Sequence, residues 1–283
     1  MALQIAAFEE EDWMSLYEAF LSAFSNYFVR FAPSKEDFEK RIFHKLYIDG
    51  PLSRLAWEDG QVAGFLLHTH GPYRGKSTLY NGGTGVVPAF QRQNIATRLY
   101  ENLLHHLSAA PAIQQIVLEV VDQNQAGLKF YEQLDFKYTQ SFKCFKLTTP
   151  VEERLLEGIN FHTPSNWASY DELFSIQPAF LDTSDHLTHN KANEHIIEAT
   201  HNDQVVGAVI FQPHLGRISQ LVVDEAWRAR GIGRQLCARA QKVSKGKPLT
   251  LMNVTEDAYD TIEALEAIGF VNEVNQFELE LII

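Results

Sequence analysis

Cysteine is scarce in this chain, whose 283 residues include Cys144 and Cys237 and no others. Two cysteines so far apart do not form the closely spaced set that a disulfide framework requires. Long apolar runs are missing as well, so no segment is expected to span a bilayer. The first residues lead into the acidic run 9–12 rather than into an apolar stretch, so no signal peptide is expected. We therefore expect a cytoplasmic protein that has no membrane partner.

Positive charge is also in short supply: 24 lysines and arginines face 36 aspartates and glutamates, a net charge of −12. Nucleic-acid binding requires a basic face, so nucleic acid is not an expected partner. The histidines have no accompanying ligand set at zinc-site spacing, and no metal is expected. The chain is rich in apolar residues, with 45% hydrophobic and 12% aromatic residues. That amount suffices for packed cores and argues against disorder.

The most informative stretch is residues 221–236. Its apolar run 221–223 predicts the end of a buried strand, and the apolar residues that recur from Ile232 at helical spacing predict a helix. The first N–H groups of a helix lack internal partners and carry partial positive charge, and Gly231 and Gly233 leave them open to an anion. Three basic side chains add positive charge: Arg228, Arg230 and Arg234. The stretch therefore predicts a binding site for a phosphate or a pyrophosphate.

The same pattern occurs earlier, at residues 86–99. Gln91 stands where Arg228 stands in the later copy, an offset of 228 − 91 = 137, and Ala96 stands in the place of Gly233. A second landmark, Leu-Asp-Phe ending at residue 136, returns as Ile-Gly-Phe ending at residue 270, an offset of 269 − 135 = 134. Two landmarks at nearly one offset indicate an internal duplication. We therefore predict two domains of ordinary size, 1–149 and 150–283, joined near residues 148–150.

Periodicity and turn signals predict similar elements in both halves. In the first half the expected strands are 3–8, 53–57, 62–70, 76–87, 116–121 and 136–147, with helices at 13–24, 34–47, from 95, and from 124. The connector 25–33 is rich in aromatics, which are expected in the core or, alternatively, at a substrate wall. The glycines at 82, 83 and 85 predict a bulge or a close approach of a ligand. In the second half we expect a helix at 163–175 by the cap-then-proline rule, an irregular stretch at 179–193, strands at 195–201, 205–212, 218–223, 249–254 and 277–283, and helices ending near 243 and 268.

The order Val-x-x-x-x-Arg-x-x-Gly-x-Gly between a strand and a helix resembles the acyl-CoA pyrophosphate loop of the GNAT acetyltransferase superfamily. The segment 124–136, with Asn124, Tyr131 and Phe136, is similar to another part of that superfamily, and the resemblance covers nearly all of both halves. It implies an α/β (α+β) fold of two tandem GNAT-like domains, each a mixed, mostly antiparallel sheet flanked by helices. It implies acetyl-CoA as co-substrate. The residues that it implies at the cofactor are Gly85, Val86, Val87, Gln91, Arg92, Gln93, Asn94, Ile95, Ala96, Thr97 and Asn124 in the first half, and Leu221, Val222, Val223, Arg228, Ala229, Arg230, Gly231, Ile232, Gly233 and Arg234 in the second.

The two halves depart from the family pattern in different places. In the first, Asn94 replaces the loop glycine, although asparagine is the non-glycine residue that best adopts a left-handed conformation. That half keeps Asn124 and Tyr131, which by resemblance contact the CoA arm and face its sulfur. The second half has the better loop but carries Ala258 and Leu265 at those places. We therefore expect the first domain, 1–149, to be catalytic.

The implied reaction is direct transfer of an acyl group from CoA to a primary amine. A tyrosine hydroxyl can protonate a departing thiolate, which predicts Tyr131 as the acid, with helix packing beside Phe130 as the alternative. Glu119 is a candidate base, as are His68 and His70 through a chain of waters. Two other hypotheses stay open, namely catalysis in the second domain and a non-catalytic acyl-CoA-binding scaffold. The acceptor amine and the oligomeric state are left open, although a monomer with two similar domains is plausible.

Overall fold

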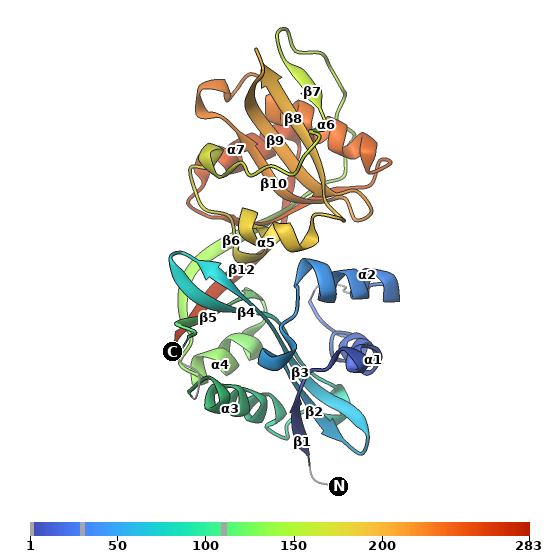
Figure 1. The fold of residues 1–283 in the computed structure, drawn as a ribbon, viewed down its shortest axis with the longest axis vertical. Coiled ribbons are helices and arrows are strands. Elements are labelled where there is room, and N and C mark those ends of the chain that lie inside the picture. The colour runs from blue at the N-terminus through green and yellow to red at the C-terminus, as the bar shows by residue number, and fades with distance from the viewer. Residues whose placement is uncertain (1–2, 29–31, 109–111) are drawn as a thin grey trace. The chain divides into compact units, whose positions relative to one another are not determined.

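The computed structural model describes residues 3–28, 32–108 and 112–283 and contains two compact units (Figure 1). The first unit comprises Met1–Thr139 and Glu278–Ile283, and the second comprises Gln140–Phe277. The end of the chain therefore completes the first unit, while residues 140–149 belong to the second. A strand joins whichever sheet edge accepts its backbone hydrogen bonds, regardless of chain order. The division at residue 150 stays a prediction about where the duplicated sequences meet.

The first unit is a mixed sheet with helices on both faces. Its strands follow the order β1-β2-β3-β4-β5, followed by the end of β12 (Val271–Ile282), and all the registered pairs among β1 to β5 are antiparallel except β4 with β5. Figure 1 shows α1 and α2 on one side of these strands and α3 and α4 on the other. The elements are β1 (Gln4–Ala7), α1 (Trp13–Ala23), α2 (Lys35–Lys40), a π-helical turn (Arg41–Lys45), β2 (Arg54–Glu58), β3 (Gln61–Tyr73), β4 (Lys76–Val86), α3 (Ile95–Ser108), β5 (Gln115–Val121) and α4 (Gln125–Gln133).

Local signals account for several of these boundaries. Ser34 caps α2, as predicted, by accepting a hydrogen bond from the Asp37 N–H at 3.1 Å. Asp59 and Gly60 both have positive φ, as the predicted tight hairpin between β2 and β3 requires. Of the aromatic connector 25–33, residues 29–31 lie outside the described residues.

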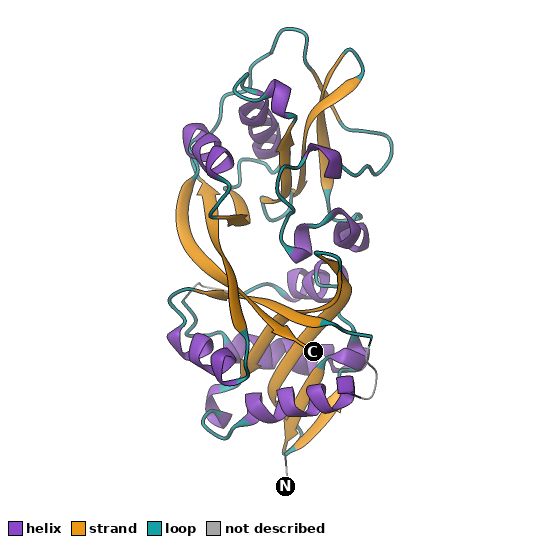
Figure 2. Ribbon diagram, turned by 90° about the vertical axis from the view of Figure 1, so that its left-hand side faces the viewer, coloured by secondary structure: helices purple, strands orange, loops and turns teal. Residues whose placement is uncertain are grey.

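The second unit repeats the plan. Its strands follow the order β12-β6-β11-β10-β9-β8-β7, with β10 and β11 parallel. Helices again flank the strands (Figure 2). Its elements are β6 (Lys137–Leu147), β7 (Asn160–His162), α5 (Ser184–Leu187), β8 (His195–His201), β9 (Gln204–Gln212), β10 (Arg217–Val223), α6 (Ile232–Val243), β11 (Leu249–Thr255), α7 (Tyr259–Ile268) and β12 (Val271–Ile282). Short 3-10 turns lie at Glu10–Asp12, Gly50–Leu52, Pro88–Phe90, Asp171–Leu173, Phe180–Asp182, Thr188–Asn190 and Glu225–Trp227.

The helix predicted at 163–175 is wrong. The chain is irregular there apart from the 3-10 turn Asp171–Leu173. Trp167, Leu173 and Phe174 instead pack against the cluster around Tyr170. Serine and asparagine in this segment favour local backbone bonds over helix, so tertiary packing decides its path.

The predicted irregular stretch 179–193 contains the one-turn helix α5, whose cap Thr183 accepts a hydrogen bond from the His186 N–H at 3.4 Å. The last strand begins six residues earlier than predicted, at Val271 rather than 277. The fold class is as predicted, with a mixed sheet flanked by helices. Across the part of the chain that the structure describes, no helix combines the length and apolarity needed to cross a membrane.

Candidate active site

Both units open their sheet at the same place. In the first unit β4 pairs with β5 only as far as Asn81 and Leu118, and the rest of each strand diverges. In the second unit β10 pairs with β11 at Arg217 and Ile218 and then diverges as well. Parallel strands that separate before they end leave backbone groups free for a ligand.

A bulge lies beside each divergence. The register between β3 and β4 skips Gly82, and the register between β9 and β10 skips Ser219. The offset is 219 − 82 = 137, the same as that of the glycine loops. A bulge leaves its extra residue outside the ladder. The glycine-rich segment of β4 was predicted to mark either a bulge or a close approach of another backbone or a ligand, and the bulge is confirmed.

The two loops share their backbone conformation. Arg92 and Asn94 have φ of 63° and 58°, and their counterparts Ala229 and Gly231 have φ of 59° and 84°. Each loop therefore uses two left-handed residues at an offset of 137, and asparagine replaces glycine without loss of the conformation. Helices α3 and α6 start at the next residue, so their first N–H groups face the loop.

The first residue of each loop motif supports the loop from within. Gln91 Nε2 donates to the Val86 carbonyl at 3.5 Å, and Arg228 Nε donates to the Val223 carbonyl at 3.3 Å. Both bonds join the motif to the end of the preceding strand. Gln91 and Arg228 therefore close the turn, and the helix N–H groups are left as the anion-binding groups.

A cleft of about 690 Å³ occupies the divergence in the second unit. It lies between the ends of β10 and β11, under the loop at Gly231 and Gly233, and along α7. Its size is that of an ordinary small-molecule site. Nine of the ten implied cofactor residues of the second half line it, namely Leu221, Val222, Val223, Arg228, Ala229, Gly231, Ile232, Gly233 and Arg234. The tenth, Arg230, lies outside the cleft wall, with its guanidinium 4.6 Å from the centre of the Trp227 ring.

The loop arginines are held by neutral oxygen atoms. Arg228 donates to Ser175 Oγ at 3.3 Å, Arg230 to the Ala226 carbonyl at 3.0 Å, and Arg234 to the Ala267 carbonyl at 3.3 Å. These bonds position the guanidinium groups without cancelling their charge. An anion at the loop would therefore meet positive charge as well as helix N–H groups.

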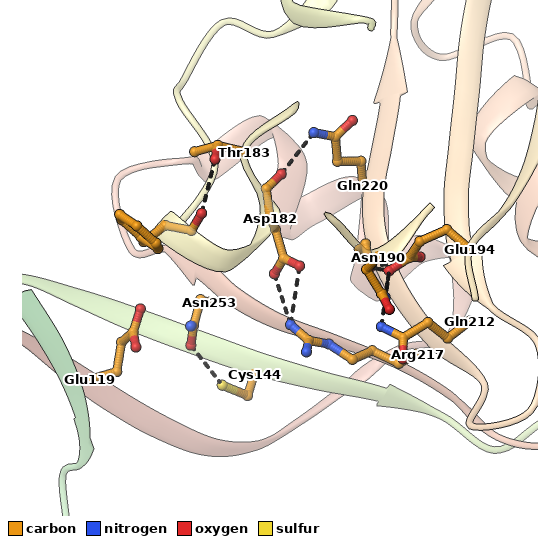
Figure 3. A network of polar contacts seen from close by, with 12 residues as sticks. Glu119, Cys144, Asp182, Thr183, Asn190, Glu194, Gln212, Arg217, Gln220 and Asn253 are labelled. Atoms are coloured by element: carbon orange, nitrogen blue, oxygen red, sulfur yellow. Dashed lines mark hydrogen bonds and ion pairs between the residues drawn. The ribbon is translucent and has the colours of Figure 1, made fainter. Parts of the chain in front are cut away.

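A polar network supports the strand that carries the bulge (Figure 3). Gln220 Nε2 donates to the Asp182 carbonyl at 2.7 Å, and Arg217 pairs with the Asp182 carboxylate at 2.9 Å. The Ser219 hydroxyl donates to Glu194 at 3.0 Å. These side chains are mostly buried, and their mutual bonds hold β10 in its bulged form.

In the first unit the corresponding space contains the unit's own side chains. A Cβ on Gly82 would overlap the side chain of Leu46, which packs directly on the bulge. The Asn81 side chain accepts a hydrogen bond from the Gly83 N–H at 2.9 Å. Gly82 and Asn81, both on the diverging strand β4, thus contact groups of the first unit itself.

Tyr131 lies in an aromatic cluster on α4. Its ring is 5.2 Å from Phe130 and 5.4 Å from Phe136, and its hydroxyl forms hydrogen bonds with Thr84 and Tyr100. Burial raises the pKa of Tyr131 to about 12. The side chain thus packs in the helix interface and also reaches the diverging part of β4.

The other predicted residues of the first unit lie on separate elements. Asn124 caps α4 through its Oδ1, which accepts the Gly127 N–H at 2.9 Å. Glu119 on β5 accepts a hydrogen bond from the Tyr80 hydroxyl. His68 is fully buried, with Nδ1 3.1 Å from the Leu52 carbonyl, and burial lowers its pKa to about 3.

Sequence reasoning missed part of the cleft wall in the second unit. The segment 173–179 lines the cleft with Phe174, Ile176 and Pro178, and Trp227 lines it from the loop. The apolar residues of that segment, followed by proline, were the available signal for an extended wall. Because a helix was expected up to residue 175, the segment was not predicted to form a wall of the cleft.

Comparison with known families agrees with this arrangement. The description "Acetyltransferase (GNAT) family" matches residues 13–136, and "Acetyltransferase (GNAT) domain" matches residues 192–272. The chain belongs to the GNAT acetyltransferase family. It carries two GNAT domains in tandem, and the family relation makes it an acyltransferase that uses acyl-CoA. No curated protein sequence matches the chain significantly.

Solved structures show the same fold at low sequence identity. A tandem GNAT protein from the clavulanic acid biosynthesis pathway has a TM-score of 0.75 and 14% identity, covering 99% of this chain and 98% of its own. A putative acetyltransferase from Pyrococcus horikoshii has a TM-score of 0.74 and 16% identity, covering 99% and 89%. A GCN5-related N-acetyltransferase from Sphaerobacter thermophilus has a TM-score of 0.70 and 16% identity, covering 99% and 95%. These likenesses establish the fold.

Proposed function

We propose that this GNAT protein transfers an acyl group, such as acetyl, from CoA to a primary amine, with the acyl-CoA held in the cleft of the second unit. The observation that carries the proposal is the cleft of about 690 Å³ bounded by β10, β11 and the loop at Gly231. In it the pyrophosphate would contact the first N–H groups of α6 and the charge of Arg234, which lines the cleft. The acyl arm would lie between the diverging strands.

The reaction needs little beyond positioning. The neutral amine nitrogen attacks the thioester carbonyl carbon, and a C–N bond forms as the carbonyl oxygen becomes an oxyanion. The backbone of β10 beyond Ile218, where the strand diverges from β11, can present an N–H group that stabilises that oxyanion. Collapse then breaks the C–S bond, the thiolate leaves, and the amine gives its proton to water. A thiol has a pKa of about 8.5, so its thiolate can leave without a strong acid, and Leu265 in place of a tyrosine is compatible with turnover.

A second location for the chemistry is the first unit. The observation that favours it is the hydrogen bond between the Tyr131 hydroxyl and Thr84 on the diverging part of β4. There Tyr131 would protonate the thiolate, Glu119 would accept the amine proton through water, and the loop 91–97 with Asn124 would hold the cofactor. This assignment stays a prediction.

Calorimetric titration of the whole chain with acetyl-CoA tests the proposal, followed by a thiol-release assay with a panel of amines. The panel includes a polyamine, an aminoglycoside, an amino acid and a peptide with a free N terminus. We expect saturable binding and thiol release that depends on one of the amines. Binding without thiol release for any amine would leave a non-catalytic acyl-CoA-binding protein, and no binding would refute the proposal.

A further inference from the structure

Tyr27 of the first unit lies where β5 ends and α4 begins. Its hydroxyl accepts a hydrogen bond from Asn124 Nδ2 at 3.5 Å, and the backbone of Val121 contributes another. Burial raises the pKa of Tyr27, and these two bonds oppose the rise without cancelling it. The phenol is therefore neutral near pH 7 and acts there as a hydrogen-bonding group.

The ring of Tyr27 is fixed to the core of the first unit. It meets Phe24 edge-on, with centroids 5.2 Å apart and planes at 88°. Phe24 in turn lies 4.7 Å from Phe20 and 6.2 Å from Phe65. Edge-to-face pairs of this kind stabilise a ring beyond the area that it buries. Tyr27 thus has a defined position although it follows the end of α1.

The groups that Tyr27 contacts belong to the proposed cofactor site of the first unit. Val121 and Asn124 lie beyond Leu118, where the pairing of β4 with β5 ends. The Oδ1 atom of Asn124 is already used by the helix cap to Gly127. Its Nδ2 amide group therefore supplies the donors that remain for a ligand, and the Tyr27 hydroxyl accepts a hydrogen bond from one of its two N–H groups.

The second unit has the opposite arrangement. At an offset of 134, Thr255 and Ala258 stand where Val121 and Asn124 stand in the first unit, and both line the open cleft. The segment 173–179, which follows the irregular start of this unit, borders the cleft instead of filling it. The first unit thus keeps the Asn124 amide, which is in contact with Tyr27. The second unit has Ala258 at that place, and its cleft is open.

We propose that Tyr27 closes the acyl-CoA cleft of the first unit by occupying the hydrogen-bonding positions that a ligand's arm would use. The inference rests on the proposed function, because it takes Asn124 as a residue that contacts the CoA arm. The pantetheine arm carries two amide carbonyls, which accept hydrogen bonds from the same donors as the Tyr27 hydroxyl. Arm and side chain therefore compete, and the loss of two hydrogen bonds weakens acyl-CoA affinity of the first unit by roughly tenfold to hundredfold. The intact protein consequently binds one acyl-CoA, in the second unit.

Calorimetric titration with acetyl-CoA in the absence of any amine tests this. We expect a stoichiometry of one for the wild-type chain and of two for Tyr27→Ala. Gly231→Val alone should abolish binding, and Gly231→Val combined with Tyr27→Ala should restore one site. Phe28→Ala is the matched control, because Phe28 is the exposed neighbour of Tyr27 and leaves the hydroxyl in place.

Each outcome separates the two proposals. No binding by the wild-type chain would contradict the proposed function itself. One site in both the wild-type chain and Tyr27→Ala would overturn the closure by Tyr27 and leave the proposed function standing, and two sites in the wild-type chain would do the same. Tyr27→Phe, which keeps the ring packing and removes the hydroxyl, gives a second test where the alanine variant unfolds. It should gain the second site if the hydroxyl closes the cleft, and a single site in a folded Tyr27→Phe chain would overturn the inference.

Discussion

The diverging ends of β4 and β5 in the first unit are occupied by Leu46, Asn81 and Tyr27, whereas those of β10 and β11 in the second enclose a cleft of about 690 Å³. The glycine loops beside them nevertheless have left-handed residues at corresponding positions, 137 residues apart. Loop conformation depends on a few adjacent residues, so it survives substitution of Gly231 by asparagine in the other copy. An open cleft depends on side chains from several elements, and these have diverged between the copies.

The largest effect is expected at Gly231. A β-branched valine does not tolerate a φ of +84°, so the loop should lose the conformation that presents the α6 N–H groups, and acetyl-CoA binding by the second unit should be abolished. Gly231→Asn is the matched control, because the first unit has asparagine at this place, and it should bind nearly as well as the wild type. Calorimetry measures both, and equal affinity of the valine variant would remove this loop from the site.

The next effect concerns stability of the first unit alone. Glu278 is fully buried in that unit and accepts hydrogen bonds from the Tyr73 hydroxyl at 3.0 Å, Arg74 at 2.6 Å and Thr139 at 2.7 Å. Glu278→Ala should lower the free energy of unfolding by about 3 kcal/mol, because several donors lose a buried acceptor. Glu280→Ala, which breaks the half-exposed pair with Lys76, should change it by less than about 1 kcal/mol. Urea unfolding at pH 7 compares the two, and equal effects would show that Glu278 is not a special anchor of the last strand.

A third effect comes from pH. His68 stays neutral in the folded first unit because burial lowers its pKa to about 3, whereas an unfolded histidine titrates near 6.5. The unfolded state therefore takes up a proton first as pH falls, and stability decreases between pH 6.5 and pH 3, by about 2 kcal/mol between pH 7 and pH 5. His68→Gln should lose this part of the pH dependence, and the exposed His70→Gln should retain it. Urea unfolding of each variant at both pH values measures the difference, and an unchanged difference in His68→Gln would contradict the assignment.

The smallest effect is expected for Tyr131→Phe. With catalysis in the second unit, turnover and acetyl-CoA affinity should stay essentially at the wild-type level, because the change removes one hydroxyl from the aromatic cluster of the first unit. A steady-state assay with the best amine of the panel measures this. A fall in turnover of about 10²–10⁴-fold, the contribution of a positioned acid, would instead place catalysis in the first unit.

The sequence by itself determined the local features of this protein. The duplication at offsets of 137 and 134, the family, the fold class, the hairpin at Asp59 and the left-handed Asn94 could all be predicted from adjacent residues or from their repetition. Such features depend on the backbone preferences of a few neighbouring residues, and the identities of those residues are given by the sequence.

Only the tertiary structure decided which cleft is open and which residues surround it. The cap-then-proline signal at Thr163 predicted a helix, but packing around Tyr170 held the segment irregular, and its continuation at 173–179 became a wall of the second cleft. From the sequence, Tyr27 could be assigned only to an aromatic connector and Leu46 only to a helix. Their partners, Asn124 for Tyr27 and Gly82 for Leu46, are distant in the chain. The end of the last strand, from Glu278 onward, likewise belongs to the first unit, where Glu278 forms hydrogen bonds with Tyr73 and Arg74. Each of these outcomes depends on contacts between residues far apart in the chain, and local propensity carries no record of such contacts.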